Sequence, residues 1–433
     1  MGSLSQNDLK ITIKSISLVY PPPMLGRRRS MFLSNIDQLF NFDIETVHFF
    51  STVESFPPST VCDTVERALQ KLLVPYDFLA GRLRLDPITG RLEIDCNGAG
   101  AGFVVASSER TLEEVGDLTY PTPAFKYLVP TRSSTGLEDW PLMAIQVTSF
   151  KCGGFAMGIS NNHATFDGAT FKTFLDNLAS LSTTGGALST HPCNDRRLLS
   201  ARSPPQVTSP HPELTNNNMD SIFDPSIDTA IETKLFHLTP SDITLLKQKA
   251  KSPHVTSFNA VTAHVWRCHA AAATTAKTST TLLYMIDLRL RHPALPKSYA
   301  GCGVWGAHAA ATPEELVEGQ FYRVAEMVRE GTERVTEEYV RSVVDELEIG
   351  KGEALMSGDL LVTSWWRLGL EMVEYPWGSP LYCCPIVDRR RGVAVFLPDV
   401  RGSDGGGGGV NILIALSRDE VERFEKMFYE FLE

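Results

Sequence analysis

Several features are scarce or absent in this chain of 433 residues, and each absence argues against a class of protein. No stretch of eighteen apolar residues occurs, so no membrane-spanning helix is expected. The first residues, Met1–Gln6, have no apolar signal-peptide core, and Gln6 stands where a myristoylation signal requires Ser or Thr. Positive charge is also scarce, because 51 acidic residues outnumber 40 Lys and Arg and give a net charge of −11. This balance argues against a nucleic-acid surface, which needs a basic field.

Cysteine pairs and several catalytic signatures are also missing. The eight cysteines are scattered without C-x-x-C spacing, and Cys383 and Cys384 are adjacent, which indicates reduced thiols and a cytoplasmic protein. No G-x-S-x-G, H-E-x-x-H or P-loop pattern occurs. The glycine-rich run Gly98–Gly102 precedes a predicted strand rather than a helix, so it lacks the helix N-terminus with which a dinucleotide fold holds phosphate.

The most informative stretch is Gly158–Gly168, where a predicted strand is followed by a polar corner and a predicted helix. His163 stands at the corner, and Asp167 stands at the helix N-cap, where a carboxylate accepts backbone N–H bonds. The strand is indicated by alternating Phe155, Met157 and Ile159, and the helix by an apolar stripe of Phe171, Phe174, Leu175, Leu178 and Leu181.

A histidine at the end of a strand suits a general base, because its pKa lies near neutrality and it can take and return a proton. The alternative is a histidine that is hydrogen-bonded inside a core, which is the commoner situation for a lone histidine. The same H-x-x-x-D spacing recurs at His191–Asp195, in a stretch rich in Pro, Ser and Thr without strand or helix. The spacing alone therefore says little, and the strand–corner–helix setting and Gly168 favour a functional site.

The length predicts two domains of about 200 residues each. Residues 182–224 are rich in Ser, Thr, Pro, Gly and Asn with little periodicity, and they predict a crossover linker. We therefore expect an N-terminal domain at 1–181 and a C-terminal domain at 225–433. A charged amphipathic stretch from residue 312 to about 348 is expected to be helical with a solvated face.

The His163 corner resembles that of the CoA-dependent acyltransferases related to chloramphenicol acetyltransferase, and among them the plant BAHD acyltransferases. Other segments match motifs of this family in the same order: Leu33–Asp37, Ala80–Gly98, Gln146–Gly154, Ala263–Arg267, Met285–Pro296 and Tyr299–Cys302. The resemblance extends from about Leu33 to the C-terminal helix. It implies an α/β fold of two chloramphenicol-acetyltransferase-like domains, with mixed sheets flanked by helices and an active-site channel between the domains.

Two segments depart from the family pattern. Cys302 replaces the Asn that usually ends the Y-F-G-N motif. The second family hallmark, D-F-G-W-G, is here Glu374–Gly378, in which Trp377 is kept and Pro376 fixes φ where a glycine normally turns. These changes bear on the acceptor pocket more than on the chemistry. They also motivate an alternative, a non-catalytic BAHD-like protein that acts through a partner enzyme.

The resemblance implies transfer of an acyl group from CoA to the hydroxyl or amine of a small molecule in plant specialised metabolism. A hydroxycinnamoyl group is the first expectation, and acetyl or fatty acyl groups stay open. His163 would act as general base without a covalent intermediate, and Asp167 would hold the corner by pairing with Arg291 or Arg289. Trp377 would lie near the developing oxyanion, and Gly168, Glu374 and Gly378 would support the site.

CoA, a co-substrate rather than a permanently bound cofactor, would contact Ser257, Arg389 and Arg390. Basic clusters such as Arg389–Arg391 suit an anionic ligand, although they could equally be solvated surface runs. His264, Cys268 and His269 lack a further ligand at suitable spacing, so no metal is expected. The protein is expected to be a monomer.

Overall fold

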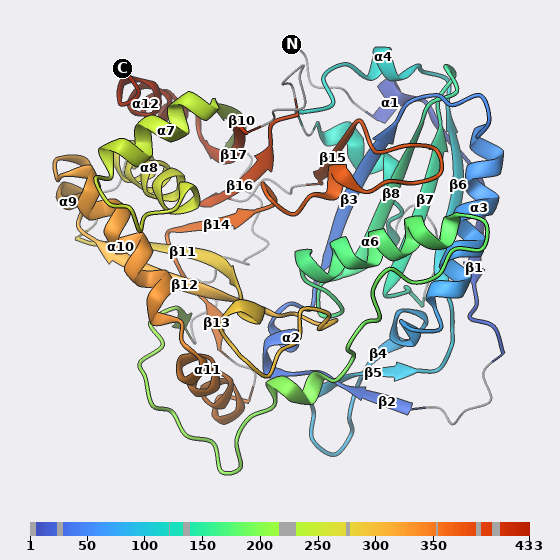
Figure 1. Cartoon of the computed structure of the whole chain (residues 1–433), viewed down its shortest axis with the longest axis horizontal. Helices are drawn as coiled ribbons and strands as arrows, with labels where there is room; N and C mark the ends of the chain where they lie inside the picture. Colours follow the sequence, from blue (N-terminus) through green and yellow to red (C-terminus); the bar gives the residue numbers. More distant parts are fainter. Residues whose placement is uncertain are drawn as a thin grey trace. The chain divides into compact units, whose positions relative to one another are not determined.

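The computed structural model describes residues 6–23, 29–120, 122–132, 139–215, 231–273, 278–351, 354–386, 391–400 and 408–433. The chain divides into two compact units, and each carries a six-stranded sheet among the described residues (Figure 1). Unit 1 comprises residues 1–200, 294–303 and 368–387, and unit 2 comprises residues 201–293, 304–367 and 388–433.

The domain boundaries therefore differ from the contiguous ones predicted at residues 181 and 225. The strand β15 (Tyr382–Pro385) pairs with β3 (Asp43–Phe50), so a segment near the C-terminus completes the sheet of unit 1. The predicted linker also divides, since residues 182–200 belong to unit 1 and 201–215 to unit 2. Its remainder, residues 216–224, lies outside the described residues.

The main sheet of unit 1 has the strand order β1-β6-β7-β8-β3-β15. β6 and β7 run parallel, and the other neighbours are antiparallel. Every residue of β8 is buried, because strands flank it on both sides and helices and loops cover the sheet. The remaining strands of this sheet are β1 (Ile11–Val19), β6 (Ala101–Ser108), β7 (Met143–Ser149) and β8 (Phe155–Asn162).

Two long helices of unit 1, α3 (Pro58–Leu72) and α6 (Gly168–Ser182), pack against each other (Figure 1). The predicted stripe of α6 is confirmed for Phe171, Phe174, Leu175 and Leu178, which are buried, whereas Leu181 at the end of the helix is half-buried. The smaller elements are α1 (Gln6–Leu9), α2 (Asn35–Leu39), α4 (Leu112–Val115), the 3-10 turns η1 (Asp77–Ala80), η2 (Pro123–Leu128) and η3 (Arg196–Leu199), and the sheet of β2 (Arg29–Phe32), β5 (Leu92–Cys96) and β4 (Arg82–Leu85).

The main sheet of unit 2 has the strand order β10-β17-β16-β14-β11-β12, with β14 parallel to both of its neighbours. Its helix α8 packs against α7, α10 and α12. The strands are β10 (Ile231–Leu238), β11 (Thr280–Asp287), β12 (Val304–Ala311), β14 (Leu360–Ser364), β16 (Val393–Pro398) and β17 (Val410–Ser417). The other elements are α7 (Pro240–Lys249), α8 (Ser257–Ala272), η5 (Leu288–Leu290), α12 (Arg418–Glu430), η6 (Leu370–Met372, in unit 1) and the pair β9 (Leu214–Thr215) and β13 (Leu355–Met356).

The stretch from residue 312 to 348 is helical as predicted, but it forms three helices rather than one. They are α9 (Pro313–Val317), α10 (Phe321–Arg334) and α11 (Glu337–Ile349). The first break follows Val317, and the second lies at Thr336, whose side chain accepts a hydrogen bond from Tyr339 N and starts a new helix. New N-caps inside a periodic stretch thus divide it.

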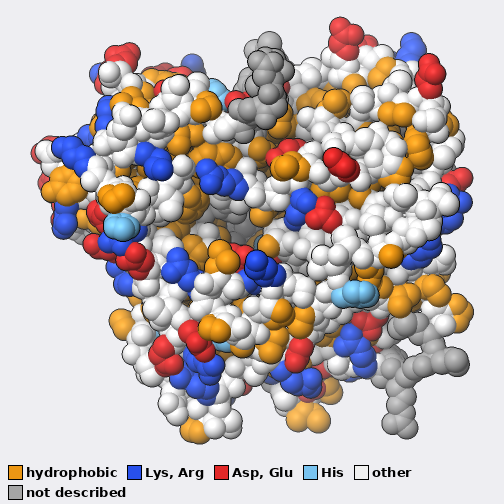
Figure 2. Space-filling view, in the orientation of Figure 1, with side chains coloured by type: hydrophobic (Ala, Val, Ile, Leu, Met, Phe, Trp, Pro, Cys, Tyr) orange, Lys and Arg blue, Asp and Glu red, His pale blue; other side chains and the backbone are white. Residues whose placement is uncertain are grey.

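The surface agrees with the acidic composition. On the face that Figure 2 displays, acidic and basic side chains are interspersed rather than gathered into one basic field. None of the helices in the described ranges combines the length and the apolar character that a membrane span requires.

Candidate active site

His163 directly follows β8, at the end of the buried central strand. Its backbone N–H donates to the carbonyl oxygen of Phe42 at 2.8 Å, which continues the pairing between β8 and β3. Its half-buried ring stacks on Phe40, with centroids 4.8 Å apart, and meets Phe42 at 5.3 Å in a tilted arrangement. Two aromatic side chains therefore hold the imidazole at the strand end.

Burial lowers the pKa of His163 below its ordinary value of 6.5. A backbone hydrogen bond within the residue and the carboxylates of Asp167 and Asp37 act in the opposite direction but do not outweigh burial. The imidazole is therefore neutral at pH 7 and has one nitrogen lone pair available. This is the state that a general base needs before it takes a proton.

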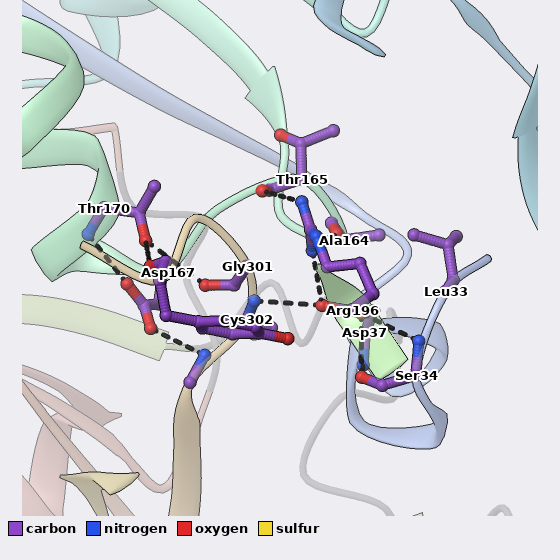
Figure 3. Close-up of polar contacts among 12 residues, drawn as sticks. Leu33, Ser34, Asp37, Ala164, Thr165, Asp167, Thr170, Arg196, Gly301 and Cys302 are labelled. Atoms are coloured by element: carbon purple, nitrogen blue, oxygen red, sulfur yellow. Dashed lines mark hydrogen bonds and ion pairs between the residues drawn. The ribbon is translucent and has the colours of Figure 1, made fainter. Parts of the chain in front are cut away.

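Asp167 holds the corner through backbone groups. As the N-cap of α6 its Oδ1 accepts a hydrogen bond from Thr170 N at 2.9 Å, which confirms the predicted cap. Its Oδ2 accepts a second bond from Gly303 N at 2.7 Å (Figure 3). The following Gly168 is closely packed, since a Cβ there would lie 2.7 Å from Leu368 Cδ1. The carboxylate thus ties the corner to a distant turn instead of facing a substrate.

A buried ion pair, Asp37–Arg196, holds the corner from a second side (Figure 3). Asp37 Oδ1 accepts hydrogen bonds from Arg196 Nη1 at 2.8 Å and from Cys302 N at 2.9 Å. Arg196 Nη2 donates to the carbonyl oxygen of Thr165 at 2.8 Å, and Nη1 also donates to that of Ala164 at 3.3 Å. The guanidinium therefore binds the backbone of the turn between His163 and Asp167.

Sequence reasoning missed both members of this pair. A signal existed for Asp37, because it ends the family-like segment Leu33–Asp37 and forms a capping box with Ser34, whose backbone N–H donates to its carboxylate at 2.8 Å. Arg196 lies in the stretch predicted as a linker. No local pattern distinguishes it from the neighbouring Arg197, which is exposed.

The turn from Tyr299 to Gly303 also belongs to this site. Thr170 Oγ1 donates to the carbonyl oxygen of Tyr299 at 3.0 Å, which adds a bond to those made by Cys302 N and Gly303 N. The turn directs Cys302 Sγ toward His163, and the sulfur lies 3.5 Å from Nδ1 of the imidazole.

The structure does not bring Trp377 to His163, so the predicted place near the developing oxyanion is corrected. The indole packs on Phe50 and Phe155, with ring centroids 6.3 and 6.0 Å away, and it stacks on Tyr375 at 5.1 Å. Phe155 begins β8 and His163 follows its end. A strand rises about 3.3 Å per residue, so this separation of eight residues spans about 26 Å. Trp377 is a core residue of the opposite end of the sheet.

The residues around Trp377 form a β-turn. Gly378 N donates to the carbonyl oxygen of Tyr375 at 2.9 Å, and Pro376 occupies the second position of the turn, where its fixed φ is favourable. Gly378 has a φ of 98°, a conformation that glycine adopts without strain. Glu374 precedes the turn and is exposed. Proline therefore replaces the family glycine at a position that suits it.

The other predicted site residues lie in unit 2 or outside the described residues. Arg289 donates from Nη1 to Asp287 Oδ1 at 3.0 Å, and Arg291 follows the short turn η5. The pairing of Asp167 with Arg291 or Arg289 stays a prediction. Ser257 is the first residue of α8, whereas Arg389 and Arg390 lie outside the described residues.

His264, which the sequence raises as a possible metal ligand, has another role. His264 Nε2 lies 3.1 Å from the carbonyl oxygen of Phe428 in the core of unit 2. Within the described part of the chain, no three His, Cys, Asp or Glu side chains are grouped as metal ligands would be.

Solved structures share this fold of two sheet-containing units. The structure is similar to the crystal structure of vinorine synthase, with a TM-score of 0.74 and 22% identity over 96% of each chain. It is also similar to TRI101 of F. sporotrichioides complexed with coenzyme A and T-2, with a TM-score of 0.75 and 17% identity over 92% of this chain and 97% of the other. These likenesses confirm the predicted α/β fold of two sheet-containing domains with helices.

Sequence relatives define the family. The family profile described as "Transferase family" matches residues 9–431. Acyltransferase GLAUCE of Arabidopsis thaliana is 48% identical over 98% of this chain and 97% of its own length. Omega-hydroxypalmitate O-feruloyl transferase of the same plant is 31% identical over 98% and 93%. Shikimate O-hydroxycinnamoyltransferase of Nicotiana tabacum is 31% identical over 98% and 100%. The chain belongs to this family, the BAHD acyltransferases, and is an acyltransferase.

Proposed function

We propose that the protein transfers an acyl group from CoA to the hydroxyl or amine of a small molecule, with His163 as the general base. The observation that carries this proposal is a histidine with a lowered pKa at the end of β8, in a turn where Arg196 binds the carbonyl groups of Ala164 and Thr165 and the carboxylate of Asp167 binds two N–H groups. Such a residue is neutral, rigidly held and able to accept a proton.

The reaction follows from a neutral imidazole. His163 takes the proton of the acceptor hydroxyl or amine, and the acceptor atom attacks the thioester carbonyl carbon. The tetrahedral intermediate collapses, the carbon–sulfur bond breaks, and the imidazolium returns its proton to the CoA thiolate. No acyl-enzyme is required, because two substrates held together react at a high effective concentration.

A hydroxycinnamoyl group is the acyl group that we propose. Several relatives of this chain are named as feruloyl or hydroxycinnamoyl transferases at 31 to 33% identity, including putrescine hydroxycinnamoyltransferase 1 of rice. Phe40 and Phe42 place aromatic surface directly beside His163, which suits a flat aromatic acyl chain. Acetyl and fatty acyl groups lack this match and serve as comparison donors.

CoA is an anion, and the residues proposed to contact it are Ser257, Arg389 and Arg390. Ser257 lies in the first turn of α8, where the helix dipole favours negative charge. We also propose a cytoplasmic monomer, and the eight free cysteines support a reducing compartment.

The test measures CoA release by the purified protein. Coumaroyl-CoA, feruloyl-CoA, acetyl-CoA and palmitoyl-CoA are each combined with a panel of alcohols and amines. His163→Ala should lower kcat by about a hundred- to ten-thousand-fold, the usual worth of a general base. His191→Ala is the matched control, because it removes an exposed histidine with the same spacing to an aspartate and should leave kcat unchanged.

Two outcomes would contradict the proposal. A His163→Ala protein that keeps more than about a third of wild-type turnover would show that His163 is not the base. A wild-type protein that releases no CoA with any combination would instead favour the non-catalytic alternative, which acts through a partner enzyme.

A further inference from the structure

A thiol lies next to the proposed base. Cys302 Sγ is 3.5 Å from His163 Nδ1, which is within hydrogen-bonding distance for sulfur, and the cysteine is fully buried. Cys302 stands where the family motif usually ends in asparagine. The mechanism proposed above assigns no role to it.

The backbone that carries this sulfur is held by hydrogen bonds to two carboxylates (Figure 3). Cys302 N donates to Asp37 Oδ1 at 2.9 Å, and the next backbone N–H, of Gly303, donates to Asp167 Oδ2 at 2.7 Å. Two buried carboxylates thus hold consecutive peptide groups. A side chain on such a clamped turn has little freedom to move, and its distance to the imidazole is part of the fold.

We propose that Cys302 is a positioning residue for His163. In the neutral imidazole, Nδ1–H donates to Sγ and the lone pair resides on Nε2, which becomes the basic nitrogen. This inference rests on the proposed role of His163 and adds a second partner that holds its ring. Stacking on Phe40 restricts the plane of the ring, and the sulfur engages Nδ1 in addition to the backbone hydrogen bond within the residue.

The thiol of Cys302 also has a predictable effect on the basicity of His163. Sulfur is a weak acceptor, and an N–H on a charged imidazolium makes a stronger hydrogen bond than one on neutral imidazole. The contact therefore favours the protonated form slightly and raises the pKa of His163 against the effect of burial. Removing the sulfur should lower that pKa further and leave the ring held only by stacking and by the hydrogen bond within the residue.

The competing role for Cys302 is that of a nucleophile. Its thiolate would attack the thioester carbonyl, CoA would leave as the thiol with the proton from His163, and an acyl-Cys302 enzyme would form. Full burial of the side chain argues against this route. The two roles differ in one measurable product, since only the nucleophile adds the mass of an acyl group to the protein.

The experiment compares wild type with Cys302→Ala and Cys302→Ser, and uses Cys384→Ala as control for the loss of another buried thiol of unit 1. With Cys302→Ala we expect kcat to fall about tenfold, since a misplaced base loses rate without losing substrate affinity. The KM for acyl-CoA should stay within about twofold of wild type. Cys302→Ser keeps an acceptor and should recover part of kcat, and Cys384→Ala should behave as wild type.

Nitrogen-15 spectra of histidine-labelled protein test the tautomer without substrate, with the His163 signals assigned by their loss in His163→Ala. Wild type should show Nδ1 protonated and Nε2 unprotonated, and Cys302→Ala should show a lower midpoint of titration. Wild type in the opposite tautomer, or a Cys302→Ala spectrum identical to wild type, would overturn the proposal. If Cys302→Ala fails to fold, the tautomer of the wild-type protein and the kcat of Cys302→Ser decide whether Cys302 positions His163.

Intact mass after incubation with acyl-CoA alone completes the test. An unmodified protein supports positioning, whereas an acyl adduct that is absent from Cys302→Ser overturns it in favour of the nucleophile. A wild-type protein that shows the expected tautomer but no turnover would contradict the proposed function and leave the contact between sulfur and imidazole established. The two proposals therefore fail in different ways.

Discussion

Two segments of unit 1 match the two hallmarks of the family, yet they are held by different forces. The corner His163–Asp167 is fixed by hydrogen bonds to charged groups: Arg196, which is paired with Asp37, engages its backbone, and Asp167 binds two N–H groups. The turn Tyr375–Gly378 is fixed by aromatic packing and by a backbone hydrogen bond across it.

This difference determines what each segment tolerates. A change of a single atom can destabilise a buried polar network, because each donor or acceptor left unpaired carries a desolvation cost. The stability of an aromatic cluster depends on its buried area and shape, and the stability of a turn depends on the φ angles of its residues. The corner should therefore be sensitive to single-atom changes, whereas the turn accommodates proline in place of the usual glycine.

The largest effect is expected from breaking the buried ion pair at the corner. Arg196→Met leaves the Asp37 carboxylate without its guanidinium partner in a site where both side chains are at most 1% exposed. Removing one partner of a buried pair costs about 3–5 kcal/mol. Urea unfolding should show this loss, and activity should fall with it because the backbone of the corner is no longer held.

Arg197→Met is the control, since this neighbouring arginine is exposed and its loss should not change the unfolding midpoint. The double variant Arg196→Met with Asp37→Asn should be less destabilised than the sum of the single variants, because the unpaired charge is gone. An Arg196→Met protein as stable as wild type would show that the corner does not depend on the pair.

Asp167→Asn should cost less, because the side chain keeps its shape and one of its two acceptor atoms. The new amide N–H₂ cannot accept the bond from Thr170 N or from Gly303 N, so one buried backbone donor loses its partner. We expect a loss of about 1–4 kcal/mol together with a lower kcat. The matched control is Asp195→Asn, an exposed cap of η3 that receives one bond from Arg197 N.

Melting temperatures of the two aspartate variants separate structural from catalytic roles. If Asp167→Asn melts like wild type and loses only activity, then Asp167 acts directly on the base, and the structural role described above is wrong.

Local features of this fold were predictable from the sequence. Asp167 caps α6 as predicted, because a cap involves residues three positions apart, and the same local rule underlies the capping box of Thr239 and Asp242. The strand before His163 and the apolar stripe after it follow the same rule, since alternation and helical spacing are local patterns. The place of the base between strand and helix could therefore be predicted.

Features that depend on distant pairing could not be predicted in this way. β15 joins the sheet of unit 1 through β3, more than 300 residues earlier, and no local pattern encodes that choice. Arg196 and Asp37 are 159 residues apart, and each looks like an ordinary charged residue in its own segment. Trp377 was assigned to the site because the family motif carries it, whereas only the packing on Phe155 shows which end of the sheet it occupies.

The pH dependence of kcat/KM tests the lowered pKa of His163. Because burial lowers the pKa of His163 below 6.5, kcat/KM should be flat at neutral pH and fall only when the pH drops through that lowered pKa. Below it, the rate should fall tenfold per pH unit, which is about 1.4 kcal/mol. An acid limb centred above pH 6.5 would contradict the effect of burial.

The same shift affects stability, and its sign follows from proton binding. The unfolded chain has an ordinary histidine that binds a proton near pH 6.5, whereas the folded chain binds it only at lower pH. The stability that this residue contributes is therefore present above pH 6.5 and is lost as the pH falls through the folded pKa. Unfolding of His163→Ala across this range should show a weaker dependence on pH than wild type.

The smallest effect is expected at the turn. Pro376 has its φ fixed at a position of the β-turn that prefers proline, so Pro376→Gly adds freedom to the unfolded chain and should destabilise by about 0.5–1 kcal/mol. Since Trp377 lies against Phe155, at the end of β8 remote from His163, the KM values for the acceptor and for acyl-CoA should both stay unchanged.

Pro376→Ala separates the loss of the proline ring from the added backbone freedom of glycine, because alanine lacks the ring but is less free than glycine in the unfolded chain. Its loss of stability should lie between those of wild type and Pro376→Gly. Steady-state kinetics that vary each substrate separately test the remaining alternative, in which the altered motif shapes the acceptor pocket. A change in acceptor preference with an unchanged KM for acyl-CoA would establish that alternative. The contrast between a catalytic corner and a structural turn would then be wrong, because both segments would govern the reaction.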